Sequence, residues 1–110
     1  MPGRYANKRD HYVVLQMDQT GGRNRWVDHY GPFSTRAEAD KVRQDQSAHY
    51  LAAYTNKFAE QYEEESLARG WGWRRSQYYF RVELISDLLR TQEGRRTLRW
   101  VGLPPEEFKR

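Results

Sequence analysis

The chain has 110 residues, no cysteine, and a formal net charge of +4 from 19 basic and 15 acidic side chains. This length fits one small domain, and the lack of cysteine excludes disulfides and thiolate metal sites. No apolar run approaches the roughly 20 residues of a membrane span, and the N-terminus lacks the apolar stretch of a signal peptide. We therefore expect a cytoplasmic protein with no membrane partner.

The N-terminal third predicts an arm followed by a hairpin. Residues 1–10 are polar and contain Pro and Gly, which favours a flexible arm ahead of a single α+β domain over residues 11–110. Residues 11–18 (HYVVLQMD) alternate between two faces, as a half-buried strand does. Gly21-Gly22 signals a turn, and residues 25–30 (RWVDHY) predict a second strand, ended by Gly31-Pro32. The short connection predicts an antiparallel hairpin.

A long helical segment follows. Thr35-Arg36-Ala37-Glu38 has the pattern of a capping box, in which the Thr and Glu side chains satisfy backbone N–H groups at a helix start. Neither Pro nor Gly occurs from there to Arg69, and Gly70 is placed to end the helix. One unbroken helix of that length would measure about 52 Å, which is longer than such a domain is wide. We expect either a break near Gln46 or a projecting helix that packs on a partner.

The next alternating stretch is residues 77–86 (QYYFRVELIS). It places Tyr78 and Phe80 on the same face as Val82 and Leu84, and its aromatic and β-branched content favours a strand with these two rings in the core. A helix over residues 78–89 is the alternative, because part of the apolar pattern also has helical spacing.

The C-terminal residues predict a second hairpin. Glu93-Gly94 has the composition of a turn, and Thr97 to Gly102 would form a fourth strand. Pro104-Pro105 would begin a last helical turn. The expected fold is therefore α+β with the order ββαββ, an antiparallel sheet of two hairpins packed on one long central helical segment.

Residues 70–80 (GWGWRRSQYYF) interleave rings with arginines. Aromatic rings stack on bases and guanidinium groups bind phosphate, so this pattern favours nucleic-acid binding. A second basic group lies in the last predicted hairpin. The residues expected to contact nucleic acid or another acidic partner are Arg74, Arg75, Arg95, Arg96, Arg99, Trp71 and Trp73. The structural alternatives are a tryptophan lid over the helix and edge charges that prevent aggregation.

The helical segment also carries an apolar face with Tyr54, Phe58 and Tyr62. Two short hairpins would cover only part of a helix of this length. We expect the exposed part of this face to contact a partner helix, and a symmetric homodimer is the commonest form of such pairing.

Catalytic signatures are missing from the sequence. His11, His29 and His49 lack the spacing of metal ligands, and the glycine pairs lack the Lys and Ser/Thr of a phosphate-binding loop. There is no nucleophile elbow. We expect no enzymatic activity, no metal, no cofactor and no small-molecule substrate.

The segment Gly-Pro-Phe-Ser-Thr-Arg-Ala-Glu-Ala, residues 31–39, is similar to the strand–turn–helix step in the arm-type DNA-binding domains of phage integrases. It also resembles small phage and plasmid proteins, and the resemblance covers at most residues 11–46. The integrase family places three strands before its helix, whereas this sequence predicts two. The resemblance implies a basic binding module of phage or mobile-element type that engages nucleic acid or a nucleic-acid-bound protein complex. The composition also suits a phage inhibitor of a host defence complex, of the anti-CRISPR kind.

Overall fold

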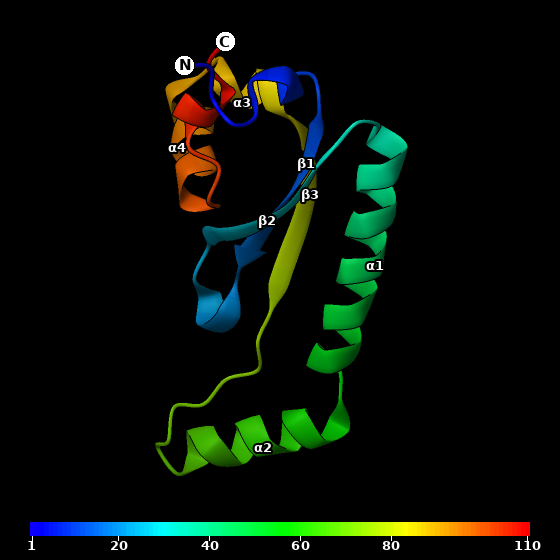
Figure 1. The fold of residues 1–110 in the computed structure, drawn as a ribbon. Helices are drawn as coiled ribbons and strands as arrows, with labels where there is room; N and C mark the ends of the chain where they lie inside the picture. The colour runs from blue at the N-terminus through cyan, green and yellow to red at the C-terminus, as the bar shows by residue number, and fades with distance from the viewer.

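The computed structural model describes residues 1–110 and has an α+β fold built on a three-stranded antiparallel sheet (Figure 1). The central strand is β1 (Tyr12–Asp18), with β2 (Arg25–Phe33) on one side and β3 (Tyr78–Leu84) on the other. Helices lie against both faces of the sheet, so β1 is buried over most of its length. None of the helices is both long enough and apolar enough to cross a lipid bilayer.

The predicted N-terminal hairpin is confirmed, and its second strand is longer than expected. β2 continues through Gly31-Pro32 to Phe33, where the sequence predicted an end. The extra residue forms a β-bulge, because Val14 pairs with Tyr30 while Tyr12 pairs with Phe33. Gly31 has a backbone φ of 104°, a conformation that residues other than glycine rarely adopt.

Helix α1 (Arg36–Tyr54) begins at the predicted cap. The Thr35 hydroxyl oxygen accepts a hydrogen bond from the Glu38 N–H at 3.2 Å. The Glu38 carboxylate accepts from the same hydroxyl at 3.0 Å instead of reaching the Thr35 backbone. From this start, α1 lies along one face of the sheet, over a small core of Val14, Ala39, Phe80 and Val82.

The helical segment breaks at Thr55-Asn56, so the predicted break near Gln46 is wrong. The Thr55 hydroxyl donates to the Leu51 carbonyl, and the Asn56 side-chain oxygen accepts from the N–H groups of Phe58 and Ala59. Asn56 is thus the N-cap of a second helix, α2 (Lys57–Ala68). Figure 1 shows α2 lying across the foot of the molecule, below the end of α1.

The opposite face of the sheet is covered at one end by α3 (Ile85–Leu89), α4 (Gln92–Trp100) and the turn Pro105–Phe108. These elements enclose the larger core of the protein, formed by Val13, Leu15, Ile85, Leu88, Leu98, Val101, Leu103 and Phe108. The strand predicted over residues 77–86 is confirmed from Tyr78 to Leu84. The chain is helical only from Ile85, so the alternative helix over residues 78–89 is wrong for most of its length.

The predicted fourth strand is wrong, and with it the ββαββ order of two hairpins. Thr91 caps α4 by accepting from the Gly94 N–H at 2.9 Å, so Glu93-Gly94 lies in the first turn of a helix. β3 pairs with β1, from Tyr12 opposite Leu84 to Asp18 opposite Tyr78. α4 forms because Thr97, Leu98 and Val101 are buried together at helical spacing.

The segment predicted as an arm lies against the C-terminal turn. The Gly3 N–H donates to the Lys109 carbonyl at 2.8 Å, and the Tyr5 N–H donates to the Glu107 carbonyl at 2.6 Å. The Tyr5 ring stacks on Phe108 with 5.6 Å between centroids. The two termini consequently lie together at the end of the molecule opposite α2 (Figure 1).

Candidate nucleic-acid interface

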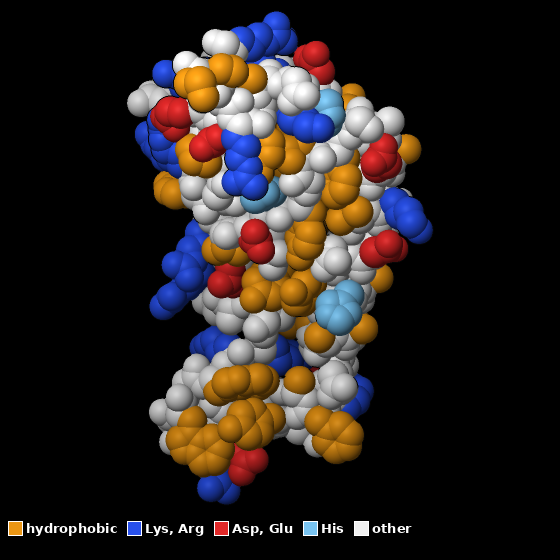
Figure 2. Space-filling view, viewed as in Figure 1, with side chains coloured by type: hydrophobic (Ala, Val, Ile, Leu, Met, Phe, Trp, Pro, Cys, Tyr) orange, Lys and Arg blue, Asp and Glu red, His pale blue; other side chains and the backbone are white.

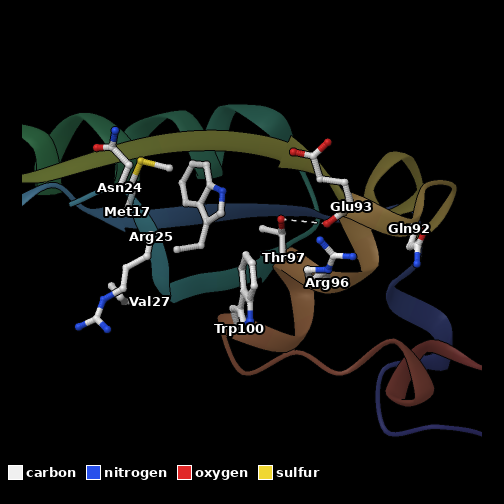
Figure 3. A pocket seen from close by; sticks show the side chains of 10 residues that line it. Met17, Asn24, Arg25, Val27, Gln92, Glu93, Arg96, Thr97 and Trp100 are labelled. Atoms are coloured by element: carbon white, nitrogen blue, oxygen red, sulfur yellow. Dashed lines mark hydrogen bonds between the residues drawn. The ribbon is translucent and has the colours of Figure 1, made fainter. Parts of the chain in front are cut away.

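A groove opens where α4 stops covering the sheet. It has a volume of about 930 Å³, and α4 forms one wall while β1 and β2 form the other (Figure 3). A hydrogen bond from Nδ1 of His29 to the Val101 carbonyl joins β2 to the end of α4 and so sets the spacing of the two walls. The groove is lined by Met17, Asn24, Arg25, Trp26, Val27, Gln92, Glu93, Arg96, Thr97 and Trp100.

Aromatic rings stand on both walls of the groove. Trp100 comes from α4 and is 58% exposed. Trp26 comes from β2, where it pairs with Met17 across the sheet, and it is only half-buried. The Arg81 guanidinium lies 5.1 Å from the Trp26 ring centroid, and the ring of Tyr79, also on β3, lies 6.3 Å from Trp26. The part of the sheet that α4 leaves uncovered, which we call the open half of the sheet, therefore presents ring faces and cations together.

Four arginines of this face form no ion pair, although Glu93 also lines the groove. None of the eight ion pairs in the structure involves Arg23, Arg25, Arg74 or Arg96. In Figure 3, Arg25 extends outward from its strand at one rim, and Arg96 lies on the α4 side. Free guanidinium forks on a groove attract anionic groups, and each fork can bind a phosphate through two N–H groups.

A smaller polar notch of about 330 Å³ lies beside the β1–β2 turn. Its lining includes Arg23 and Arg74, and it contains no hydrophobic side chain. Asp18 also lines it. Burial acts to raise the pKa of Asp18, but hydrogen bonds from Thr20 and the charges of Arg25 and Arg23 outweigh burial and lower this pKa. Asp18 is therefore ionised at neutral pH and offsets part of the positive charge of the notch.

Arg75, predicted as a binding residue, is engaged within the protein. Its N–H donates to Glu63 at 2.6 Å, its guanidinium pairs with the same carboxylate at 3.2 Å, and Nη1 donates to the Tyr54 carbonyl at 2.8 Å. The guanidinium also lies 4.1 Å from the Tyr54 ring centroid. The backbone N–H of Arg75 is the main cause of a lowered Glu63 pKa. Arg75 thus joins α2 to the following loop, while Arg74 beside it stays free.

The structure separates residues that the sequence placed on one surface. Trp71 and Trp73 pack on Tyr62 of α2, with centroids 6.3 and 4.9 Å apart, at the foot of the molecule. Arg95, Arg96 and Arg99 lie on α4 instead of a hairpin. Figure 1 shows that α2 and α4 are at opposite ends.

Only Arg96 of the α4 arginines lines the groove. Arg95 donates to the Leu89 carbonyl at 2.9 Å, and Arg99 pairs with Glu106 at 2.6 Å. Both side chains brace α4 against its neighbours in the chain. Their predicted contact with an acidic partner stays a prediction.

The sequence prediction did not include Arg25, Trp26 and Trp100 of the groove or Arg23 of the polar notch. Arg23-Asn24-Arg25-Trp26 interleaves cations with a ring just as residues 71–75 do, and this composition was an available signal. Trp100 had no such signal, because it faces the groove only once residues 92–100 are helical.

Comparison with protein-family models, curated proteins and solved structures gives no match. The similarity of residues 31–39 to the arm-type DNA-binding domains of phage integrases therefore stays a prediction. In the structure, two strands precede α1 and the third strand of the sheet follows α2.

Proposed function

We propose that this protein is a non-enzymatic binding module, of phage or mobile-element type, that engages single-stranded nucleic acid, free or within a protein complex. The proposed site is the groove between α4 and the open half of the sheet. The observation that carries the proposal is the combination of exposed rings with four arginines that form no ion pair.

The rings favour unpaired bases over a duplex. Trp100, Trp26 and Tyr79 offer ring faces on one side of the molecule, and a base gains about 1–3 kcal/mol by stacking on such a ring. In a duplex the bases already stack on one another, so these rings would find no exposed base face. Stacking also tolerates every base, so we expect weak sequence preference.

The arginines supply the affinity for the backbone. Arg25 and Arg96 lie at the groove, and Arg23 with Arg74 extends the positive surface to the polar notch beside it. Contacts of this kind release counterions, with a salt slope of about −0.7 per phosphate for single strands. Three or four contacts predict a slope of about −2 to −3.

Fluorescence anisotropy with a labelled oligothymidylate of about 12 nucleotides tests the proposal, because known single-strand sites span about 4–16 nucleotides. Trp100→Ala should weaken binding by roughly 5- to 150-fold, which corresponds to the loss of one stacked base. Arg96→Ala should make the salt slope shallower by about 0.7. A duplex of the same length should compete poorly.

Matched controls lie elsewhere on the chain. Trp71→Ala removes an exposed tryptophan at the foot, and Arg36→Ala removes an exposed arginine at the start of α1. Both should leave affinity unchanged. Absence of oligonucleotide binding at low salt, or an equal loss in Trp71→Ala, would refute the groove as the site.

A second candidate function is inhibition of a host nucleic-acid complex through α1. It is favoured by a shallow groove of about 330 Å³ between α1 and β3, whose lining is mostly apolar and includes Tyr50, Leu51 and Tyr54. Capture of the same host complex from bacterial lysate with and without nuclease would support this function. It requires that Leu51→Glu abolish the capture while Trp100→Ala does not.

A further inference from the structure

The foot of the molecule carries an exposed aromatic surface. We call Phe58, Tyr62, Trp71 and Trp73 the aromatic foot; their exposures are 82%, 49%, 55% and 42%. Both tryptophans lean on Tyr62, so three of the rings form one cluster and Phe58 stands apart, one helical turn before Tyr62. Figure 2 shows hydrophobic side chains gathered on this end of the molecule.

The aromatic foot extends beyond the compact part of the protein. The molecule is 54 Å long, and its Cα radius of gyration is 16.8 Å, against about 13 Å for a compact chain of this length. α2 is held to the rest by the two-residue link after α1 and by the Arg75–Glu63 pair. The four rings do not line the groove beside α4, so the proposed function does not account for them.

We propose that the aromatic foot binds a second copy of this chain, with the two α2 helices antiparallel about a twofold axis. At about 200 Å² for a fully buried ring, the exposed parts of the four rings amount to roughly 450 Å² in one copy. Two copies would bury roughly 900 Å² of ring surface. The stems of neighbouring polar side chains bring the total near the ~1,000 Å² that a specific interface needs.

Charge selects the antiparallel orientation. Phe58, Tyr62, Glu65 and Arg69 follow one another at intervals of four, three and four residues, so they share one face of α2 and its C-terminal end. A parallel pair would oppose Glu65 to Glu65 and Arg69 to Arg69. Within one chain Arg69 pairs with Glu65 at 3.0 Å, and its guanidinium lies 5.2 Å from the Trp71 ring centroid. An antiparallel pair places this ion pair beside Phe58 and Tyr62 of the second copy, with Arg69 positioned for a cation–π contact with Phe58.

Light scattering coupled to size exclusion tests the pairing. At tens of micromolar we expect a mass near twice the 13.2 kDa of one chain for the wild type and for Gln44→Glu, which adds a charge to an exposed position of α1. Phe58→Glu should have the mass of a single chain. This variant should still fold, because Phe58 is exposed and a carboxylate suits the first turn of a helix. A wild-type mass of one chain would overturn the proposal.

The absence of native cysteine makes the orientation measurable by cross-linking. In the antiparallel pair two copies of position 65 lie near the twofold axis, so Glu65→Cys should form a disulfide-linked dimer on oxidation. Two copies of position 69 would be on the order of 16 Å apart along the helix axis, at 1.5 Å per residue, so Arg69→Cys should stay unlinked. Equal linking of both variants would overturn the antiparallel arrangement.

Oligonucleotide binding separates this inference from the proposed function. Phe58→Glu should keep the wild-type affinity of each groove, and Trp100→Ala should keep the double mass. Loss of binding in Phe58→Glu, with its circular dichroism spectrum unchanged, would show that the aromatic foot is a nucleic-acid surface and would refute its assignment to a second copy.

Discussion

Gly94→Ala tests the packing that positions α4, and its sign depends on the tertiary structure. In an exposed helix this change stabilises by about 1 kcal/mol, because alanine has the higher helix propensity. In this protein a Cβ at position 94 would overlap the Leu88 carbonyl oxygen and lie 2.7 Å from the Leu88 Cα. Both are backbone atoms and neither can rotate away, so α4 must shift away from α3.

The expected result is a net loss of about 1–3 kcal/mol, the usual cost of overpacking a core. That cost corresponds to a fall of roughly 4–24 °C in Tm for a domain of this size. Thermal unfolding followed by circular dichroism measures it, with Glu93→Ala as the control because Glu93 is exposed in the same turn. Because α4 is one wall of the groove, oligonucleotide affinity should fall as well. A Tm for Gly94→Ala equal to or above that of the wild type would refute the close approach of α3 and α4.

Three other predictions concern the strand and the loop before it. Phe80→Ala should cost about 3–5 kcal/mol because its ring is buried against α1, whereas Tyr79→Ala, on the other face of β3, should change Tm little and weaken oligonucleotide binding. In chemical denaturation Arg75→Ala should destabilise the protein by detaching α2 from the loop, and Arg74→Ala should not; equal effects would contradict the distinct roles of these neighbours. The Arg75 backbone N–H lowers the pKa of Glu63 below its ordinary 4.5, so this carboxylate contributes stability above about pH 4.5 that is lost as pH falls through the lower folded-state pKa. An acid titration of Glu63→Gln, which has no titratable group at this position, should therefore show less loss of stability in that window than the wild type.

Local signals determined much of the fold. Alternation over residues 11–18 and 77–86 predicted two strands because the period of a half-buried strand is visible in single residues. Thr35 and Glu38 marked the start of α1 because a cap acts within one helical turn. The same locality marks Asn56, whose side chain caps α2, although the sequence pattern suggested the polar run around Gln46 as one possible position of a break. Gln46 instead continues α1 and accepts a hydrogen bond from the Tyr30 hydroxyl at 3.3 Å, a contact between distant parts of the chain.

Tertiary contacts decided the remainder. Residues 97–102 contain enough β-branched and aromatic side chains to suggest a strand, but burial of Leu98 and Val101 against the sheet requires helical spacing. That change moved Arg95, Arg96 and Arg99 onto a helix and brought Trp100 to the groove. Arg74 and Arg75 are chemically identical in the sequence, and the contacts of Arg75 with Glu63 and Tyr54, 12 and 21 residues earlier in the chain, distinguish them. A sequence states which side chains can stack or bind phosphate, whereas packing between distant segments determines which of them remain free to do so.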